Sequence, residues 1–263
     1  MRRSDDAAPA AQRRGRAVCA ALLLVAFRLG AGASADVTDR LRQAVPLAAG
    51  TTLEVDVSIG DVRVVGAARD DVAVEIVRTA PSAADLARFP VEIDGDATRR
   101  RVRIRQSGTD PRLRATVDLE VPRTARIDAL RIAEGRLEVS DFAGAVAADV
   151  RRGPIVATRV RGVLRLEAGI GDIDLRQVRL DPDGLVRART FNGDLRLVFA
   201  ERPADARIMA LALNGTVRSE IPLTLKTGWG PRWGETTLGR GEPVVSLDVV
   251  TGDIRIEAPP RRP

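Results

Sequence analysis

The 263-residue sequence contains no histidine and no tyrosine, and its single cysteine is Cys19. Histidine is the most frequent general base and metal ligand in proteins, so its absence removes the usual catalytic and metal-binding arrangements. Aromatic residues make up only 3% of the chain, and Trp229 and Trp233 are its two tryptophans. We therefore predict no catalytic residues, no metal and no cofactor.

The N-terminal segment has the organisation of a signal peptide. Three arginines between residues 13 and 16 precede an apolar run from Ala17 to Phe27, and the small residues Ala33-Ser34-Ala35 follow. The run is too short to cross a bilayer as a helix. We predict a signal peptide over residues 1–35 with cleavage after it, and no integral membrane span afterwards. A retained membrane anchor is the alternative. Cleavage would remove Cys19 and leave an exported chain without disulfides.

The charge balance does not favour nucleic acid as a partner. The chain has 42 basic and 36 acidic residues, a net charge of +6. Residues 1–35 hold six arginines and two aspartates, so the remainder has 42 − 6 = 36 basic and 36 − 2 = 34 acidic residues, or +2. Arginine is used in place of lysine, and Lys226 is the sole lysine. A basic stripe interleaved with aromatic residues, which nucleic-acid binding requires, is missing.

A short phrase recurs along the chain: a glycine, a polar or turn residue, then alternating hydrophobic and polar residues. It occurs at Gly60, Gly135, Gly153, Gly171, Gly193, Gly215 and Gly252. From Gly135 onward the spacings are 18, 18, 22, 22 and 37 residues. A weaker phrase follows about nine residues after two of these glycines, at Gly144 and Gly162. The alternation predicts half-buried strands, and glycine suits sharp corners between them.

These repeats predict an all-β fold, a β-solenoid that stacks parallel coils of 18–22 residues as a β-helix does. Some antiparallel strands are expected in the N-terminal part. The predicted domain covers residues 36–257, with N-terminal strands and a hairpin in 50–125 and repeat coils in 126–257. Residues 258–263 are predicted to be a disordered tail.

Two segments have helical features. Apolar residues at Val37, Leu41 and Val45 have i, i+4, i+8 spacing, which predicts a helix that caps the first coil. Ser82 is a candidate N-cap for a second helix that ends before Pro90. After it, two alternating segments flank Asp94-Gly95 and predict a β-hairpin.

Three segments resemble a known family. They are LEVDVSIGDVRVVGAARDDVAVEI, TVDLEVPRTARIDALRIAEGRLEV and TTLGRGEPVVSLDVVTGDIRIE. They resemble the bacterial β-strand-repeat proteins known as putative adhesins or as a domain of unknown function, over most of residues 50–257. The resemblance implies an exported location and a β-helical stack. It implies no catalytic or binding residues.

The candidate partner-binding residues form two groups. Trp229, Arg232 and Trp233 lie in a segment rich in glycine and proline, and tryptophan is a favoured recognition residue. This segment is either a binding site or an end cap of the stack. Arg196 and Arg218 occupy the outward position of successive repeat phrases, where they would meet an anionic partner or only solvate the surface. Asp174 is expected to form an ion pair with Arg196 on the next coil.

Aspartates that follow the corner glycines have two interpretations. They are Asp61, Asp172, Asp194 and Asp253. Stacked carboxylates bind Ca²⁺ in some proteins. However, Arg136, Pro154 and Thr216 interrupt the column, so we predict that these aspartates accept hydrogen bonds from turn amides instead.

The sequence therefore predicts an exported, non-catalytic, adhesin-like binding or scaffold module of the cell envelope, in the periplasm or on the cell surface. Its partner would be an envelope or extracellular glycan or protein. The alternative is a polysaccharide-active enzyme on a β-helix fold, because aspartates are available for an acid pair. A third interpretation is a sensor-like envelope component whose partner is a membrane protein.

Overall fold

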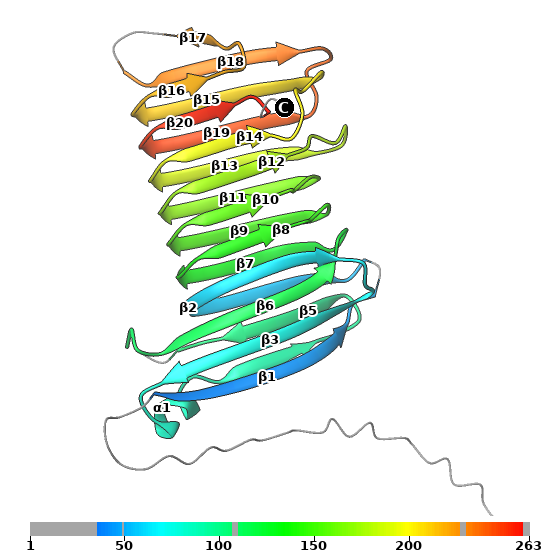
Figure 1. Cartoon of the computed structure of the whole chain (residues 1–263), viewed down its shortest axis with the longest axis vertical. Coiled ribbons are helices and arrows are strands. Elements are labelled where there is room, and N and C mark those ends of the chain that lie inside the picture. The colour runs from blue at the N-terminus through cyan, green and yellow to red at the C-terminus, as the bar shows by residue number, and fades with distance from the viewer. Residues whose placement is uncertain (1–35, 49, 107–109, 227–229, 260–263) are drawn as a thin grey trace, which may run out of the picture. The chain divides into compact units, whose positions relative to one another are not determined.

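The computed structural model describes residues 36–48, 50–106, 110–226 and 230–259. In these residues one short helix accompanies twenty strands, which hydrogen bond into one mixed and mostly parallel sheet (Figure 1). The predicted signal peptide, residues 1–35, lies outside the described residues, as do residues 260–263 of the predicted tail.

The elements fall into three groups along the chain. The N-terminal elements are β1 (Val37–Pro46), β2 (Thr52–Ala67), β3 (Asp71–Ala80), α1 (Ala83–Ala87), β4 (Val91–Gly95), β5 (Arg99–Ile104) and β6 (Arg114–Pro122). The central strands are β7 (Arg126–Glu134), β8 (Leu137–Ser140), β9 (Ala145–Arg152), β10 (Ile155–Thr158), β11 (Val163–Ile170), β12 (Ile173–Val178), β13 (Leu185–Asn192) and β14 (Leu195–Phe199). The C-terminal strands are β15 (Ala206–Asn214), β16 (Val217–Ser219), β17 (Thr224–Lys226), β18 (Arg232–Leu238), β19 (Val244–Thr251) and β20 (Ile254–Glu257).

The sheet has two layers, and strand β2 takes part in both. Its first half pairs with β5 and β7, and its second half pairs with β6 and β8. Gly60 lies between the halves, where an added Cβ would come within 2.1 Å of a neighbouring backbone oxygen. A larger residue has no space at this bend. The first layer continues through β7, β9, β11 and β13, and the second through β8, β10, β12 and β14.

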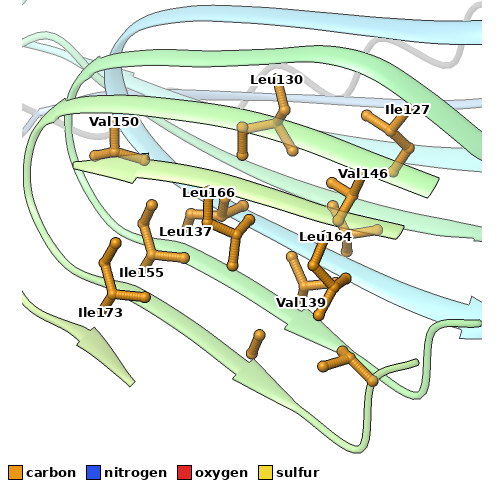
Figure 2. Close-up of a cluster of buried hydrophobic side chains, with 14 of the residues drawn as sticks. Ile127, Leu130, Leu137, Val139, Val146, Val150, Ile155, Leu164, Leu166 and Ile173 are labelled. Atoms are coloured by element: carbon orange, nitrogen blue, oxygen red, sulfur yellow. The ribbon is translucent and has the colours of Figure 1, made fainter. Parts of the chain in front are cut away.

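The core lies between these two layers (Figure 2). In β8, β10 and β11 every second side chain is buried, as period-2 alternation predicts. Leu137, Ile155 and Ile173 align on neighbouring parallel strands of the second layer, and each is 0% exposed. Val146 and Leu164 align in the first layer and point toward them. Each such side chain contributes about 1.5–3 kcal/mol through burial.

Corner glycines stack directly on one another. A Cβ at Gly153 would lie 1.8 Å from the backbone oxygen of Gly135, and one at Gly171 would lie 2.1 Å from that of Gly153. Both have positive φ, +137° and +151°, which disfavours other residues independently of space. The recurrent glycine is therefore required by close contact between backbones as well as by the turn.

The predicted β-solenoid is wrong. The strands form one open mixed sheet whose order departs from a regular stack of coils. The last repeat, at Gly252, lies between the repeats at Gly193 and Gly215, because β19 pairs with both β13 and β15 and β20 pairs with both β14 and β16. Antiparallel pairing also joins β15, β18 and β17, so it is not confined to the N-terminal part. The phrase specifies a turn and a strand but not which strand becomes the neighbour.

The predicted helix over residues 36–45 is also wrong, because this segment forms strand β1, antiparallel to β3 along its length. Val37, Leu41 and Val45 are separated by even numbers of residues, so the same spacing places them on one face of a strand. The other local predictions are confirmed. Ser82 caps α1 by accepting a hydrogen bond from the Asp85 amide, and β4 and β5 form the hairpin.

Candidate functional site

Trp233 lies in β18, beyond the parallel strands of the first layer. It is aligned with Leu211 of β15 on one side and with Lys226 of β17 on the other. The Nζ atom of Lys226 is 4.6 Å from the centroid of the Trp233 ring, a cation–π contact. Trp229, the other tryptophan predicted to bind a partner, lies outside the described residues.

A hollow of about 310 Å³ lies beside this pair. Its lining residues are Thr216, Val217, Leu225, Lys226, Arg232 and Trp233. Leu225 is 47% exposed, which is high for a large apolar side chain. The side chain of Leu225 packs over Gly234, where a Cβ would come within 2.8 Å of it. The hollow thus combines an apolar wall with cationic side chains, a combination that suits a partner with both apolar and anionic or hydroxyl groups.

The two predicted arginines in the repeat phrases are not neighbours. Arg196 in β14 aligns with Arg255 in β20, and Arg255 aligns with Arg218 in β16. Arg196 donates two hydrogen bonds to Glu257, at 2.9 and 2.7 Å, and these lower the pKa of the Glu257 carboxyl. The expected ion pair with Asp174 is confirmed at 3.9 Å. Arg196 is therefore held by carboxylates on its own surface.

Arg218 is exposed, and neither it nor Arg255 forms an ion pair with any described carboxylate. Neither Arg196 nor Arg218 lines the hollow at Trp233. Strand alternation places Arg218 on the opposite face of β16 from Val217, which does line it. The two predicted groups of binding residues thus lie at separate places.

The corner aspartates accept backbone hydrogen bonds from neighbouring strands, as predicted. Asp172 accepts from the amide of Asp194, Asp194 from that of Asp253, and Asp253 from that of Thr216, each at 2.8 Å. The hydrogen bond from Thr216 lowers the pKa of Asp253. In the described part of the chain, no three acidic side chains gather in a way that could hold a metal ion.

The resolved pKa shifts of the acidic groups have one direction. Among the described residues, every carboxyl group with a resolved shift has its pKa lowered, chiefly by hydrogen bonds from arginine side chains, from turn amides or, for Asp96, from the Thr98 hydroxyl. For Asp110 the value falls to about 2, because Arg112 donates to it through both its side chain and its backbone. A glycosidase acid needs a raised pKa. These carboxylates instead serve as acceptors in structural contacts.

Sequence reasoning missed a second hollow, of about 600 Å³, at the opposite corner of the central strands. Three non-glycine residues there have left-handed backbone conformation, Asp141, Arg159 and Gln177, with φ of 55°, 54° and 54°. The signal was present in the triplets Asp-Phe-Ala, Arg-Val-Arg and Gln-Val-Arg, which recur every 18 residues from 141. They carry no glycine at the turn, so a search for turn glycines passes over them.

Comparison with known proteins shows the fold. No family model matches the chain, and no curated protein matches it. A solved structure of a putative cell adhesion protein from Clostridium sporogenes is similar at 13% identity with a TM-score of 0.50, covering 84% of this chain and 100% of that chain. A putative adhesin from Bacteroides fragilis matches at 9% identity with a TM-score of 0.38, covering 84% of this chain and 97% of that chain.

The likeness to the Clostridium protein shows a shared fold. Within the described ranges, no helix has the length and hydropathy needed to cross a membrane.

Proposed function

We propose that this protein is an exported, non-catalytic binding module of the cell envelope, adhesin-like in function, with residues 1–35 as its signal peptide. It holds an envelope glycan or an envelope protein at the hollow beside Trp233. The observation that carries the proposal is the contact between the partly buried Trp233 and the exposed Lys226, next to an open hollow with an apolar wall. Tryptophan in such a setting is a frequent anchor of binding surfaces.

The alternative interpretation of Trp233, as an end cap, fits the side-chain positions less well. An end cap would bury its ring among the core residues. Trp233 is only partly buried and is absent from the buried core, and it shares its face of the sheet with Leu211 and Lys226. This surface is open to a partner.

The shared fold gives further support. The Clostridium protein with this fold is called a putative cell adhesion protein. An extended sheet surface with aligned side chains also suits adhesion, because a partner can contact several strands at once.

The test mixes the purified protein with isolated envelope polysaccharides and with whole cells, and measures co-sedimented protein and released sugar. We expect saturable co-sedimentation without sugar release, and a large loss of binding in Trp233→Ala. The matched control is Phe191→Ala, because Phe191 is also exposed on the first layer with a cation over its ring, Arg189 at 4.5 Å. This control should bind normally.

Each outcome has a distinct meaning. Equal loss in both variants would reject the hollow as the binding site. Release of sugar fragments would reject a non-catalytic function. Binding to cells but to no isolated polysaccharide would assign the hollow to an envelope protein, provided that Trp233→Ala abolishes it.

A further inference from the structure

The left-handed residues Asp141, Arg159 and Gln177 form a column along one corner of the central strands. Each directs the following side chain into the core: Phe142 is 0% exposed and Val160 is 1% exposed. Each also turns the chain so that the next residue faces solvent. The 18-residue spacing therefore aligns outward residues along this corner.

The outward residues form a second column with arginines at its centre. The amide of Arg161 donates to the carbonyl of Phe142, and the amide of Arg179 donates to the carbonyl of Val160. Arg161 and Arg179 thus lie on neighbouring turns, about 4.8 Å apart along the stacking direction. Ala143 and Ala200 occupy the equivalent positions on either side. Short side chains flanking two long ones leave the hollow of about 600 Å³, a typical size for a ligand-binding cleft.

Arginine predominates among the charged lining residues of the hollow. Four arginines line it, Arg123, Arg159, Arg161 and Arg179, against one acidic residue, Asp141. Asp141 is already neutralised, because Arg159 donates to both of its carboxylate oxygens at 2.7 Å. Arg123 forms no ion pair with any described carboxylate.

The two central arginines have only weak intramolecular partners. Arg161 is 3.7 Å from Asp181, and Arg179 is 3.3 Å from Glu201. Their side chains are 51% and 56% exposed, so solvent screens both contacts. Two like charges on neighbouring turns repel each other, and an external anion would relieve this repulsion.

The lining residues distinguish between classes of anion. The large apolar residues of the hollow are buried, so no exposed aromatic ring is present for stacking nucleic-acid bases. For the same reason the hollow offers lipid chains no exposed large apolar side chain. Gln177 is exposed, and its side chain makes no hydrogen bond with another described residue, so its amide can bind hydroxyl groups. Guanidinium groups bind carboxylates, sulfates and phosphates in bidentate fashion.

We propose that this corner hollow is a second binding site, specific for an acidic polysaccharide, whose charged groups contact Arg161 and Arg179 and whose hydroxyl groups contact Gln177. The site shares no lining residue with the hollow at Trp233. It therefore does not depend on the function proposed for Trp233.

The test measures binding of the purified protein to polygalacturonate, dextran sulfate and neutral dextran by isothermal titration calorimetry. We expect binding to at least one acidic polymer and none to dextran. The double variant Arg161→Gln/Arg179→Gln should weaken that binding about tenfold or more, which corresponds to about 1.4 kcal/mol. Glu201→Gln should strengthen it, because it removes the carboxylate that competes for Arg179.

The matched control is Arg165→Gln/Arg187→Gln. These arginines also lie on neighbouring strands and in register, on β11 and β13, where they line a separate hollow of about 410 Å³ that shares no lining residue with the corner hollow, so the same charge is removed elsewhere. Equal loss in both double variants would mean non-specific charge attraction and would overturn the proposal. So would binding to neither acidic polymer.

Two further probes separate other anions. The probes are single-stranded DNA and vesicles of phosphatidylglycerol and phosphatidylcholine. If either binds more tightly than both polymers, and Arg161→Gln/Arg179→Gln removes that binding, the ligand of the corner hollow is a nucleic acid or a lipid surface and not a polysaccharide. Trp233→Ala reports any polymer that binds at the hollow beside Trp233, and its loss should be smaller than the loss in Arg161→Gln/Arg179→Gln. If it abolishes polymer binding while the arginine variant does not, the acidic ligand belongs to the Trp233 hollow and the corner site is refuted.

Discussion

The middle of the sheet and its two ends are built in different ways. In the middle, from β7 to β14, each strand pairs in parallel with the second strand along the chain, and the corner glycines touch through their backbones. At the ends the pairing is antiparallel, between β1, β3 and β6 and between β15, β18 and β17. Some glycines there have room: a Cβ at Gly50 or Gly230 would meet nothing within 4 Å.

This difference indicates where the protein tolerates change. In the middle, backbone contact fixes the distance between strands, so each turn must repeat the last. At the ends, side-chain pairs and hairpins set the pairing, and sequence can vary with less consequence. The two candidate sites follow the same division: the corner hollow repeats an 18-residue geometry, whereas the Trp233 hollow occurs at one place.

The largest effect is expected where the middle is most crowded. Gly153→Ala would place a Cβ 1.8 Å from the backbone oxygen of Gly135, at a φ of +137°. We expect a loss of at least about 3 kcal/mol in the free energy of unfolding. Gly50→Ala changes the same residue type at a φ of +83° with open space around it, and should cost about 1 kcal/mol. Urea denaturation measures both, and similar losses would refute the distinction between middle and end.

An intermediate effect is expected where the middle meets the C-terminal end. Asp253 accepts a 2.8 Å hydrogen bond from the Thr216 amide, and this lowers its pKa below the ordinary value of 3.8. A lowered folded pKa stabilises the protein above about pH 4, and that stability is lost as the pH falls through the folded value. Asp253→Asn should cost about 1 kcal/mol at pH 7 and less at pH 3.

Unfolding free energies at pH 7, 5 and 3 give this dependence. Asp183→Asn is the control, because Asp183 is exposed and makes no hydrogen bond to another described residue. If Asp253→Asn destabilises equally at all three pH values, the charge of Asp253 does not contribute.

The smallest effect is expected for the two cation–π pairs, and it should be the same in the middle of the sheet and at its end. Lys226 over Trp233 lies at the end of the sheet, and Arg189 over Phe191 lies in the middle, at 4.6 and 4.5 Å. Each pair has one exposed member, Lys226 or Phe191, and one partly buried member. Double-mutant cycles with Lys226→Met/Trp233→Leu and Arg189→Met/Phe191→Leu should therefore each give about 0.5–1 kcal/mol of coupling. A coupling well above this range at Trp233 alone would show that the pair is part of the end packing and not a free surface.

Local features of the fold could be predicted from the sequence, whereas strand order could not. The alternation around Ile155 and Ile173, the Ser82 cap and the β4–β5 hairpin depend on neighbours in the chain, and all were recognisable. The position of β19 between β13 and β15 depends on which of several similar strands pair across distant turns. Period-2 side chains fit more than one such partner, so the pattern alone cannot select among them.

The candidate sites show the same limit. Trp233 could be recognised from residue type, but its contact with Lys226 and its hollow depend on β17 and β18 folding back. The corner hollow escaped notice because its turns use Asp141, Arg159 and Gln177 in place of glycine, and arginine and glutamine have no turn signature of their own. Their conformation is imposed by the strands on either side.

The position of β19 and β20 has a consequence for the order of folding. Residues 206–219 leave the ribosome before residues 244–257, yet β15 and β16 lie beyond β19 and β20 in the sheet. While the chain is being made, β15 and β16 therefore lack their parallel neighbours, and β13 and β14 present open edges. Such edges favour pairing with other chains. The final two strands fill a gap inside the sheet and do not extend its edge, so β15 and β16 gain parallel neighbours only when β19 and β20 pair with them.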